Sequence, residues 1–301
     1  MTGRRGFMTV PRLVTLLGLL AALVATLGGC TVNGSVSATE QQRKEFSVGE
    51  SPLVVIETFN GRISVQAASD GAVEARVTRR GSGTSDDLAK RDLANVRVDF
   101  ERVGDRITIT ARRIDQQQVL GNSGADVEVT LPAGSSVELR TSNGRVESSN
   151  VEGSVLVRTS NGPITTRGGS DLDLDTTNGQ ISVNNPEGRL QLRTSNGGID
   201  ILAAEKVAIS AQTSNSPITF SGTLGAGSHT FSTSNGDISI TLPGDAAFEF
   251  DGQTSNGSVR TEFVDLKVTD TSISGHSGED PELTIVARTS NGDLAVMTQK
   301  P

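Results

Sequence analysis

Residues that could perform catalysis or bind a metal are scarce in this sequence. Its 301 residues include two histidines and one cysteine, and neither tryptophan nor tyrosine. His229 and His276 lack a neighbouring CxxC or HExxH motif, so we interpret each as a surface or edge histidine. Cys30 has no second cysteine for a disulfide and no Cys/His cluster for zinc. We therefore expect neither a metal site nor a cofactor.

Carboxylates are the remaining candidates for chemistry. Asp171, Asp173 and Asp175 alternate along a short segment and could offer oxygen ligands to calcium. We favour a solvated acidic strand face instead, because Leu172 and Leu174 already define a strand. Cleavage of a polysaccharide would need acids or bases gathered in a cleft, whereas the acids of this chain are scattered. We predict no enzyme; a carbohydrate-active β-helix enzyme, a lyase or a hydrolase, is the alternative.

Charge and aromatic content restrict the partners. The formal net charge is −8, and because residues 1–29 carry three arginines and no acid, the rest of the chain has a net charge of −11. An acidic chain whose only aromatic residues are nine phenylalanines is poorly suited to nucleic acid. The flat amphipathic rings that line many sugar clefts are missing from the sequence. We expect no nucleic-acid partner.

The first thirty residues have the pattern of an export signal. Arg4, Arg5 and Arg12 accompany an apolar run over 13–27 that is too short to favour a membrane span. The run ends Leu-Gly-Gly-Cys30, which resembles a bacterial lipobox; this resemblance implies a diacylglyceryl group on Cys30 and cleavage before it. An ordinary signal peptide with an incidental cysteine is the alternative. The Arg-Arg-Gly-Phe-Met run also partly resembles a twin-arginine signal, and a plain basic segment explains it equally well.

These features predict a lipoprotein held by Cys30 on the extracytoplasmic side of the cell membrane. Residues 1–29 are then the lipoprotein signal peptide. Residues 30–45 are polar and have no apolar period, so we expect a tether between the lipid and the folded body.

A short internal repeat dominates the remaining sequence. The tetrapeptide Thr-Ser-Asn-Gly occurs six times, and related forms occur three times. Most successive copies lie about 18 residues apart, and the double gap before the last copy predicts a decayed copy near Ser274. The repeated asparagines, which we expect at structural turns, are Asn60, Asn143, Asn161, Asn178, Asn196, Asn215, Asn235, Asn256 and Asn291.

Apolar residues alternate with polar residues on both sides of each Asn-Gly, which predicts two strands and a corner per repeat. Two architectures fit, a meander of hairpins with type I′ turns and a parallel β-solenoid with one coil per repeat. Pro163 and Pro217 favour the solenoid, because each would remove the N–H that closes a hairpin turn. Stacking also explains the recurring Thr and Ser as ladders, with Asn and Gly at corners that accept left-handed dihedral angles. We expect the asparagines from 143 to 256 to form one column in chain order.

Stacking of coils has two further consequences on the surface. Asp175 would lie between Arg158 and Arg193, where the charges can pair. The final coil, near 293–300, would leave an edge that could accept a strand from a partner.

The sequence therefore predicts an all-β, β-helix-like fold with a parallel β-solenoid of about 18-residue coils over 136–301. Residues 46–135 are less regular, and we expect there an N-terminal β region or cap with strands over 73–79, 96–101 and 106–112. Ser85 and the acids after it predict one short helix that ends near Ala94.

The segment Val127–Gly134, followed by Val137–Gly144 and the recurring Thr-Ser-Asn-Gly-x-Ile, resembles a bacterial family of unknown function. Its members are described as adhesin-like proteins with β-strand repeats, and the resemblance covers residues 46–299. It implies an exported, often lipid-anchored β-solenoid of the cell envelope, in some cases linked to envelope stress. We expect a non-catalytic binding or scaffolding surface with an unidentified protein or envelope partner. An envelope-stress accessory protein is a further alternative.

Overall fold

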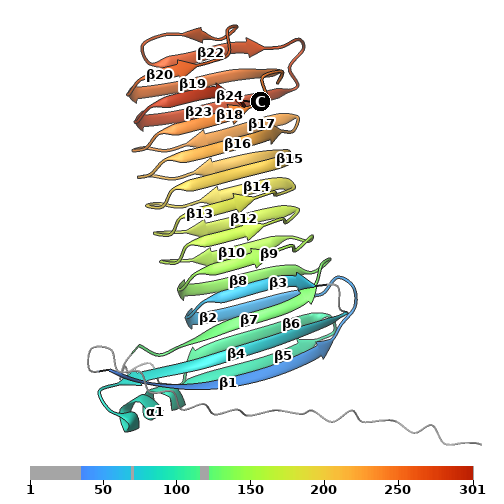
Figure 1. Ribbon diagram of the computed structural model, residues 1–301, viewed down its shortest axis with the longest axis vertical. Helices are drawn as coiled ribbons and strands as arrows, with labels where there is room; N and C mark the ends of the chain where they lie inside the picture. Colours follow the sequence, from blue (N-terminus) through green and yellow to red (C-terminus); the bar gives the residue numbers. More distant parts are fainter. Residues whose placement is uncertain (1–34, 69–70, 116–121, 301) are drawn as a thin grey trace, which may run out of the picture.

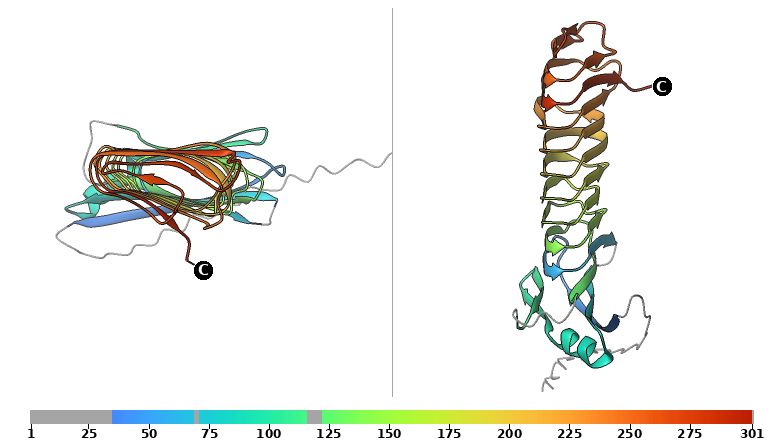
Figure 2. Two further views of the ribbon diagram at one scale, coloured as in Figure 1. Left: turned by 90° about the horizontal axis from the view of Figure 1, so that it is seen from above. Right: turned by 90° about the vertical axis from the view of Figure 1, so that its left-hand side faces the viewer.

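Two long β-sheets lie face to face in this protein and form a flattened solenoid (Figures 1 and 2). The structure is a computed structural model that describes residues 35–68, 71–115 and 122–300. Most of these residues lie in strands, and the described part has one helix. No helix among the described residues has the length and apolar character that crossing a membrane requires.

The sheet that we call the leading sheet holds the strands that precede each Asn corner. Neighbouring strands are parallel and in register, so that Val155 pairs with Val137 on one side and with Leu172 on the other. Its repeat strands, in spatial order, are β2 (Leu53–Asn60), β8 (Ser136–Asn143), β10 (Val155–Thr159), β12 (Asp171–Thr176), β14 (Gly188–Arg193) and β17 (Gly227–Ser232), with the second half of β15 (Ile199–Gln212) between the last two.

The trailing sheet holds the strands that follow each corner, and they are parallel as well. Its repeat strands, in spatial order, are β3 (Ile63–Ala68), β9 (Val146–Ser149), β11 (Ile164–Arg167), β13 (Ile181–Asn184), the first half of β15, β16 (Ile218–Leu224) and β18 (Ile238–Leu242). Parallel pairing from coil to coil confirms the predicted β-solenoid, and the alternative hairpin meander is wrong.

The core fills the space between the two sheets. Alternating residues of each strand point inward and are buried, including Leu172, Leu174, Ile181 and Val183 of one coil. Burial of each such side chain stabilises the fold by about 1.5–3 kcal/mol relative to exposure. The inward columns predicted from the alternation are therefore the core.

The N-terminal end broadens into a base made of antiparallel strands (Figure 1). β1 (Val36–Ser47) pairs with β4 (Ala72–Gly83), which pairs with β7 (Gly124–Pro132) at the end of the trailing sheet. β5 (Val96–Val103) pairs with β6 (Arg106–Arg113) at the end of the leading sheet. The predicted strands within 73–79, 96–101 and 106–112 are present.

The predicted helix is α1 (Asp86–Ala94), and the Ser85 hydroxyl accepts a hydrogen bond from the N–H of Leu88 at its N-terminus. The tether prediction for residues 30–45 is wrong from Val36 onward, because those residues belong to β1. The sequence did not indicate this strand because most of its residues are polar. β1 lies at the end of its sheet, and Phe46 is its one buried residue.

The C-terminal end does not follow chain order. β23 (Leu283–Asn291) lies between β17 and β19 (Phe248–Asn256), and β24 (Leu294–Thr298) lies between β18 and β20 (Val259–Thr261). The final coil is thus internal, so the prediction of a free edge near 293–300 is wrong. The first coil is internal too, since β2 lies between β6 and β8.

The predicted decayed copy near Ser274 is not a coil. β21 (Lys267–Val268) and β22 (Ser272–Ser277) are antiparallel and extend from β19. They form a cap at the distal end, in which Ile273 of β22 is buried, as are Phe263 and Leu266 in the segment that leads to it. The double gap in the repeat therefore marks a capping hairpin.

Candidate functional site

The repeated threonine connects each corner to its neighbour. The Oγ1 atom of Thr176 donates a hydrogen bond to the carbonyl oxygen of Gly162 (3.2 Å) in the preceding coil and accepts one from the N–H of Gly179 (3.1 Å) in its own corner. Thr194 makes the same two bonds, with distances of 3.0 and 3.1 Å. These hydroxyl groups are buried, so each threonine satisfies two backbone groups that water cannot reach.

The repeated asparagines form one ladder of amide groups along the corner. Each Nδ2 donates to the Oδ1 of the next asparagine toward the base, as Asn178 does to Asn161 (2.6 Å) and Asn196 does to Asn178 (2.7 Å). These bonds link, from the distal end, Asn256, Asn291, Asn235, Asn215, Asn196, Asn178, Asn161 and Asn143.

Two features of the ladder differ from the sequence prediction. Asn291 stands between Asn235 and Asn256, so the column is not in chain order. Asn60, which is the register partner of Asn143, donates to Asn122 (2.7 Å). Nothing in the sequence around Asn122 marks it as a member, because it lacks the repeated tetrapeptide.

The repeated glycine is required because coils approach closely. A Cβ atom on Gly179 would lie 1.9 Å from the carbonyl oxygen of Gly162, and one on Gly162 would lie 1.7 Å from that of Gly144. Neither the asparagines nor the glycines of these corners have positive φ angles. The prediction of a left-handed conformation at the corners is therefore wrong. Glycine is required there because it has no Cβ atom. The corner is a structural device whose polar atoms bond to one another.

The outward face of the leading sheet carries side chains in registered rows. Arg140 pairs with Glu57 and Glu138 (both 3.2 Å), and Arg158 pairs with Asp173 (2.5 Å). Arg158 thus selects Asp173 rather than the predicted Asp175, although Asp175 is its register partner. These side chains are about one-third to one-half exposed, so each pair contributes at most about 1 kcal/mol.

A shallow groove of 510 Å³ crosses this face from β2 to β14. Glu138, Leu156, Asp173, Arg189 and Gln191 line it. The groove offers both charges, amide groups and an apolar side chain over several coils. Such a surface suits contact with an extended partner.

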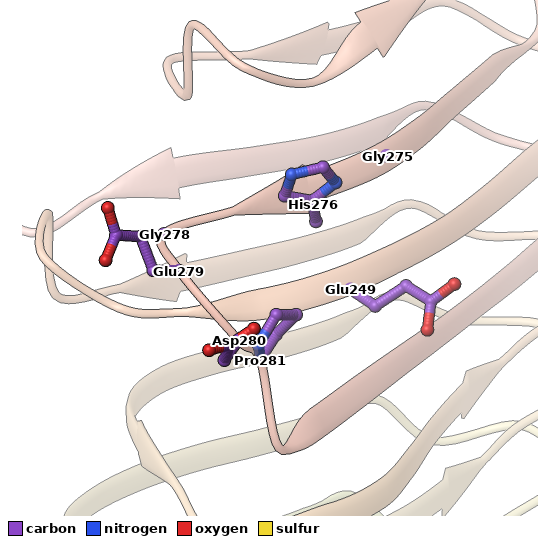
Figure 3. A pocket seen from close by; sticks show the side chains of 7 residues that line it. All are labelled: Glu249, Gly275, His276, Gly278, Glu279, Asp280 and Pro281. Atoms are coloured by element: carbon purple, nitrogen blue, oxygen red, sulfur yellow. The ribbon is translucent and has the colours of Figure 1, made fainter.

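A second groove of 510 Å³ lies near the distal end and includes Glu249, His276, Glu279 and Asp280 (Figure 3). The carboxylates do not converge, because those of Glu249 and Glu279 extend toward opposite sides (Figure 3). Within the described residues, no group of three or more His, Cys, Asp or Glu side chains could hold a metal ion. The three alternating aspartates of β12 are therefore not gathered with further ligands.

The two histidines have different environments. His276 is exposed on β22, as predicted. His229 is fully buried on β17, so the prediction of a surface or edge position is wrong for it. Its Nδ1 accepts a hydrogen bond from the N–H of Ile209 (3.3 Å), and its Nε2 lies 2.8 Å from the carbonyl oxygen of Gly225. Burial lowers the pKa of His229, although the bond to Gly225 opposes this shift.

Acids with a shifted pKa are engaged in structural contacts. A hydrogen bond from Arg79 lowers the pKa of Glu40 in the base. A hydrogen bond from Arg97 lowers the pKa of Asp99, and the N–H of Thr298 lowers that of Glu262. A general acid needs the opposite shift, so these three groups are not suited to that role.

Cys30, the predicted site of lipid attachment, lies outside the described residues. The structure therefore shows where β1 lies, but not where Cys30 lies. The first described strand lies in the base, beside α1 and at the end opposite the cap (Figure 1).

Comparisons with known proteins find similar solved structures and a matching family model. Among solved structures, a "putative adhesin" from Bacteroides fragilis NCTC 9343 has 12% identity and a TM-score of 0.42, with coverage of 85% of this chain and 96% of that chain. A "putative adhesin" from Parabacteroides merdae ATCC 43184 has 12% identity and a TM-score of 0.39, covering 86% and 96%. A "putative cell adhesion protein" from Clostridium sporogenes ATCC 15579 has 7% identity and a TM-score of 0.29, covering 87% and 100%.

No curated protein matches the chain. The family model described as Toastrack DUF4097 matches residues 45–297, which include both sheets, the base except most of β1, and nearly all of the final coil. With most of its length matched to this model, the chain belongs to the Toastrack DUF4097 family.

Proposed function

We propose that this protein is an exported, lipid-anchored lipoprotein whose solenoid serves as a non-catalytic, adhesin-like binding surface of the cell envelope. The observation that carries the proposal is the outward face of the leading sheet. There, the charged row that includes Arg140 and Arg158 and the groove beside it continue in register across successive coils. The binding roles named for its structural neighbours agree with this proposal.

The anchor and the fold together would give the surface a defined orientation. Cys30 precedes β1 by only a few residues, and β1 lies in the base. A lipid on Cys30 would therefore place the base at the membrane and direct the cap away from it (Figure 1). With strands spaced about 4.8 Å apart, the coils would project roughly 45 Å outward.

Capture of a partner from the envelope tests the proposal. The full lipoprotein, purified in detergent, is cross-linked to an envelope fraction of its own organism, and captured proteins are quantified by mass spectrometry. Arg158→Ala on the leading sheet should lower the yield of a stoichiometric partner. Arg167→Ala is the matched control, because Arg167 is an exposed arginine of the trailing sheet.

Three other outcomes would contradict this proposal or favour another function. Binding to a glycan array, together with release of new reducing ends from envelope polysaccharide, would favour the carbohydrate-active enzyme. Equal capture by Arg158→Ala and Arg167→Ala would contradict the assignment of binding to the leading sheet. A partner found only after envelope stress would favour the accessory role in that response.

A further inference from the structure

The coil formed by β23 and β24 fills a level that the chain first passes over. β18 ends at Leu242, and β19 begins at Phe248 two coil levels further on. The level left between them is bounded by β17 and β18 on one side and by β19 and β20 on the other. We call this level the slot. Residues 283–298 enter it from the C-terminal side of the cap.

Side chains on both walls of the slot form hydrogen bonds or an ion pair with the coil. Asn291 donates to Oδ1 of Asn235 on one wall (2.9 Å) and accepts from Asn256 on the other (3.0 Å). Arg288 forms an ion pair with Asp251 on β19. None of these bonds requires the coil and the walls to belong to one chain. A second copy of the sequence would present the same groups in the same register.

The connection into the slot is short and strained. Residues 278–282 join β22 to β23. Gly278 has a φ angle of 76°, and Asp280 has a φ angle of 45° in the left-handed region that a side chain disfavours. This conformation costs roughly 1–2 kcal/mol at Asp280. Short connections under strain promote exchange of the segment that they join.

We propose that residues 283–298 are an exchangeable coil, and that the slot accepts this coil from a second copy of the chain. The occupant is a second copy because the walls match Arg288, Asn291 and the buried Leu294 in a single register. The slot is second from the distal end, so exchange joins two molecules at the ends opposite β1 and α1 (Figure 1). The inference goes beyond the proposed function, since it involves neither lipid nor a foreign partner.

Pairs of single cysteines test the exchange. Ser239 on β18 and Ala295 on β24 are register partners, which places their Cα atoms within the range of a disulfide. Two full-length chains are prepared, both with Cys30→Ser, one with Ser239→Cys and one with Ala295→Cys, each with its own affinity tag. They are unfolded, mixed, refolded in mild detergent and oxidised. A disulfide between the chains requires the coil of one to occupy the slot of the other.

The control pair replaces Ser239→Cys by Ser182→Cys, which lies on the same sheet three coil levels from Ser239. The slot pair should give about tenfold more linked heterodimer than the control pair, because only the slot aligns the two thiols. A single chain with both Ser239→Cys and Ala295→Cys should close an internal disulfide, which checks refolding and register.

Equal yields from the slot pair and the control pair would overturn the proposal. So would failure of the double variant to close internally, because the slot would then not hold the coil in this register. A second measurement varies the connection. Deletion of Glu279 and Asp280 should raise the fraction of dimer in light scattering, and insertion of four glycines after Gly278 should lower it. A dimer fraction that neither the deletion nor the insertion alters would also contradict exchange.

Discussion

The four residues of the repeated corner have different tasks. Threonine supplies a buried hydroxyl that bonds to two coils, asparagine extends the amide ladder, and glycine permits close approach. The second residue of the tetrapeptide varies: most copies have serine, and one copy has Thr177, whose side chain is exposed. The repeat is thus retained by contacts between coils, and its residues have no need of a ligand.

Removal of one corner hydroxyl should destabilise the fold. Thr176→Val keeps the shape of the side chain but leaves Gly162 C=O and Gly179 N–H without their hydroxyl partner. We expect a loss of about 1–3 kcal/mol in the free energy of unfolding, measured with denaturant. Thr177→Val is the matched control, because Thr177 is exposed, and it should change stability by less than about 0.5 kcal/mol. Equal effects would argue against the hydroxyl bridge.

The corner glycine should tolerate substitution even less. Gly179→Ala places a methyl group where the neighbouring carbonyl oxygen lies, so the coils must separate. We expect a loss of about 3 kcal/mol or more, seen as a lower midpoint of thermal unfolding. Gly244→Ala is the control, because a Cβ there meets nothing within 4 Å. A fully stable Gly179→Ala variant would show that close approach does not fix this residue.

His229 should make stability depend on pH. Its pKa is lowered in the folded protein, so the unfolded chain binds the proton more readily. The free energy of unfolding should therefore fall as the pH drops below about 6.5, the ordinary pKa of histidine. His229→Leu should reduce this fall, whereas His276→Gln at the exposed histidine should retain it. Identical pH profiles for all three proteins would refute this role.

At the scale of strands, burial divides each element into an inward and an outward face. Ile181 of β13 is buried between the sheets, and its neighbour Ser182 faces outward. Ile181→Asp would bury an unpaired charge, and we expect faster amide hydrogen exchange in β11, β13 and β15. Ser182→Asp should cost at most about 1 kcal/mol, because water can solvate the new charge. Uniform exchange in both variants would contradict this division.

The sequence predicts elements that repeat, and it is less informative about elements that occur once. Period-two alternation around each Asn-Gly predicted the strands, and Pro163 and Pro217 then favoured the parallel coils that the structure has. The position of the final coil could not be inferred, because Asn291 makes the same kind of amide bond as the asparagines of the other levels. β1 was missed because its exposed residues are polar, and Asn122 was missed because it lacks the motif.

At the scale of the whole molecule, the proposed lipid anchor would determine what the solenoid can reach. We predict that mass spectrometry of the mature protein will show a diacylglyceryl adduct on Cys30. Cys30→Ser should prevent that modification and release the protein into the medium. Membrane-bound protein with an unmodified Cys30 would contradict the proposed lipoprotein.

The charge of the molecule is consistent with a lipid anchor. With a net charge of −11 after residue 29, the protein is repelled by anionic lipid. A basic patch is therefore a poor candidate for holding it to the membrane, and two or more acyl chains would suffice. The coils would then present both outward faces to the surroundings.

In the function that we propose, binding is distributed over an outward surface that has no catalytic centre. The most direct measurement is an alanine scan of outward polar residues, including Arg158 and Asp173, with affinity for the captured envelope partner as the readout. We predict graded losses of a few fold in affinity at each position, with unchanged circular dichroism. One exposed carboxylate whose removal abolishes a measurable activity, while the circular dichroism stays unchanged, would contradict it and identify an enzyme.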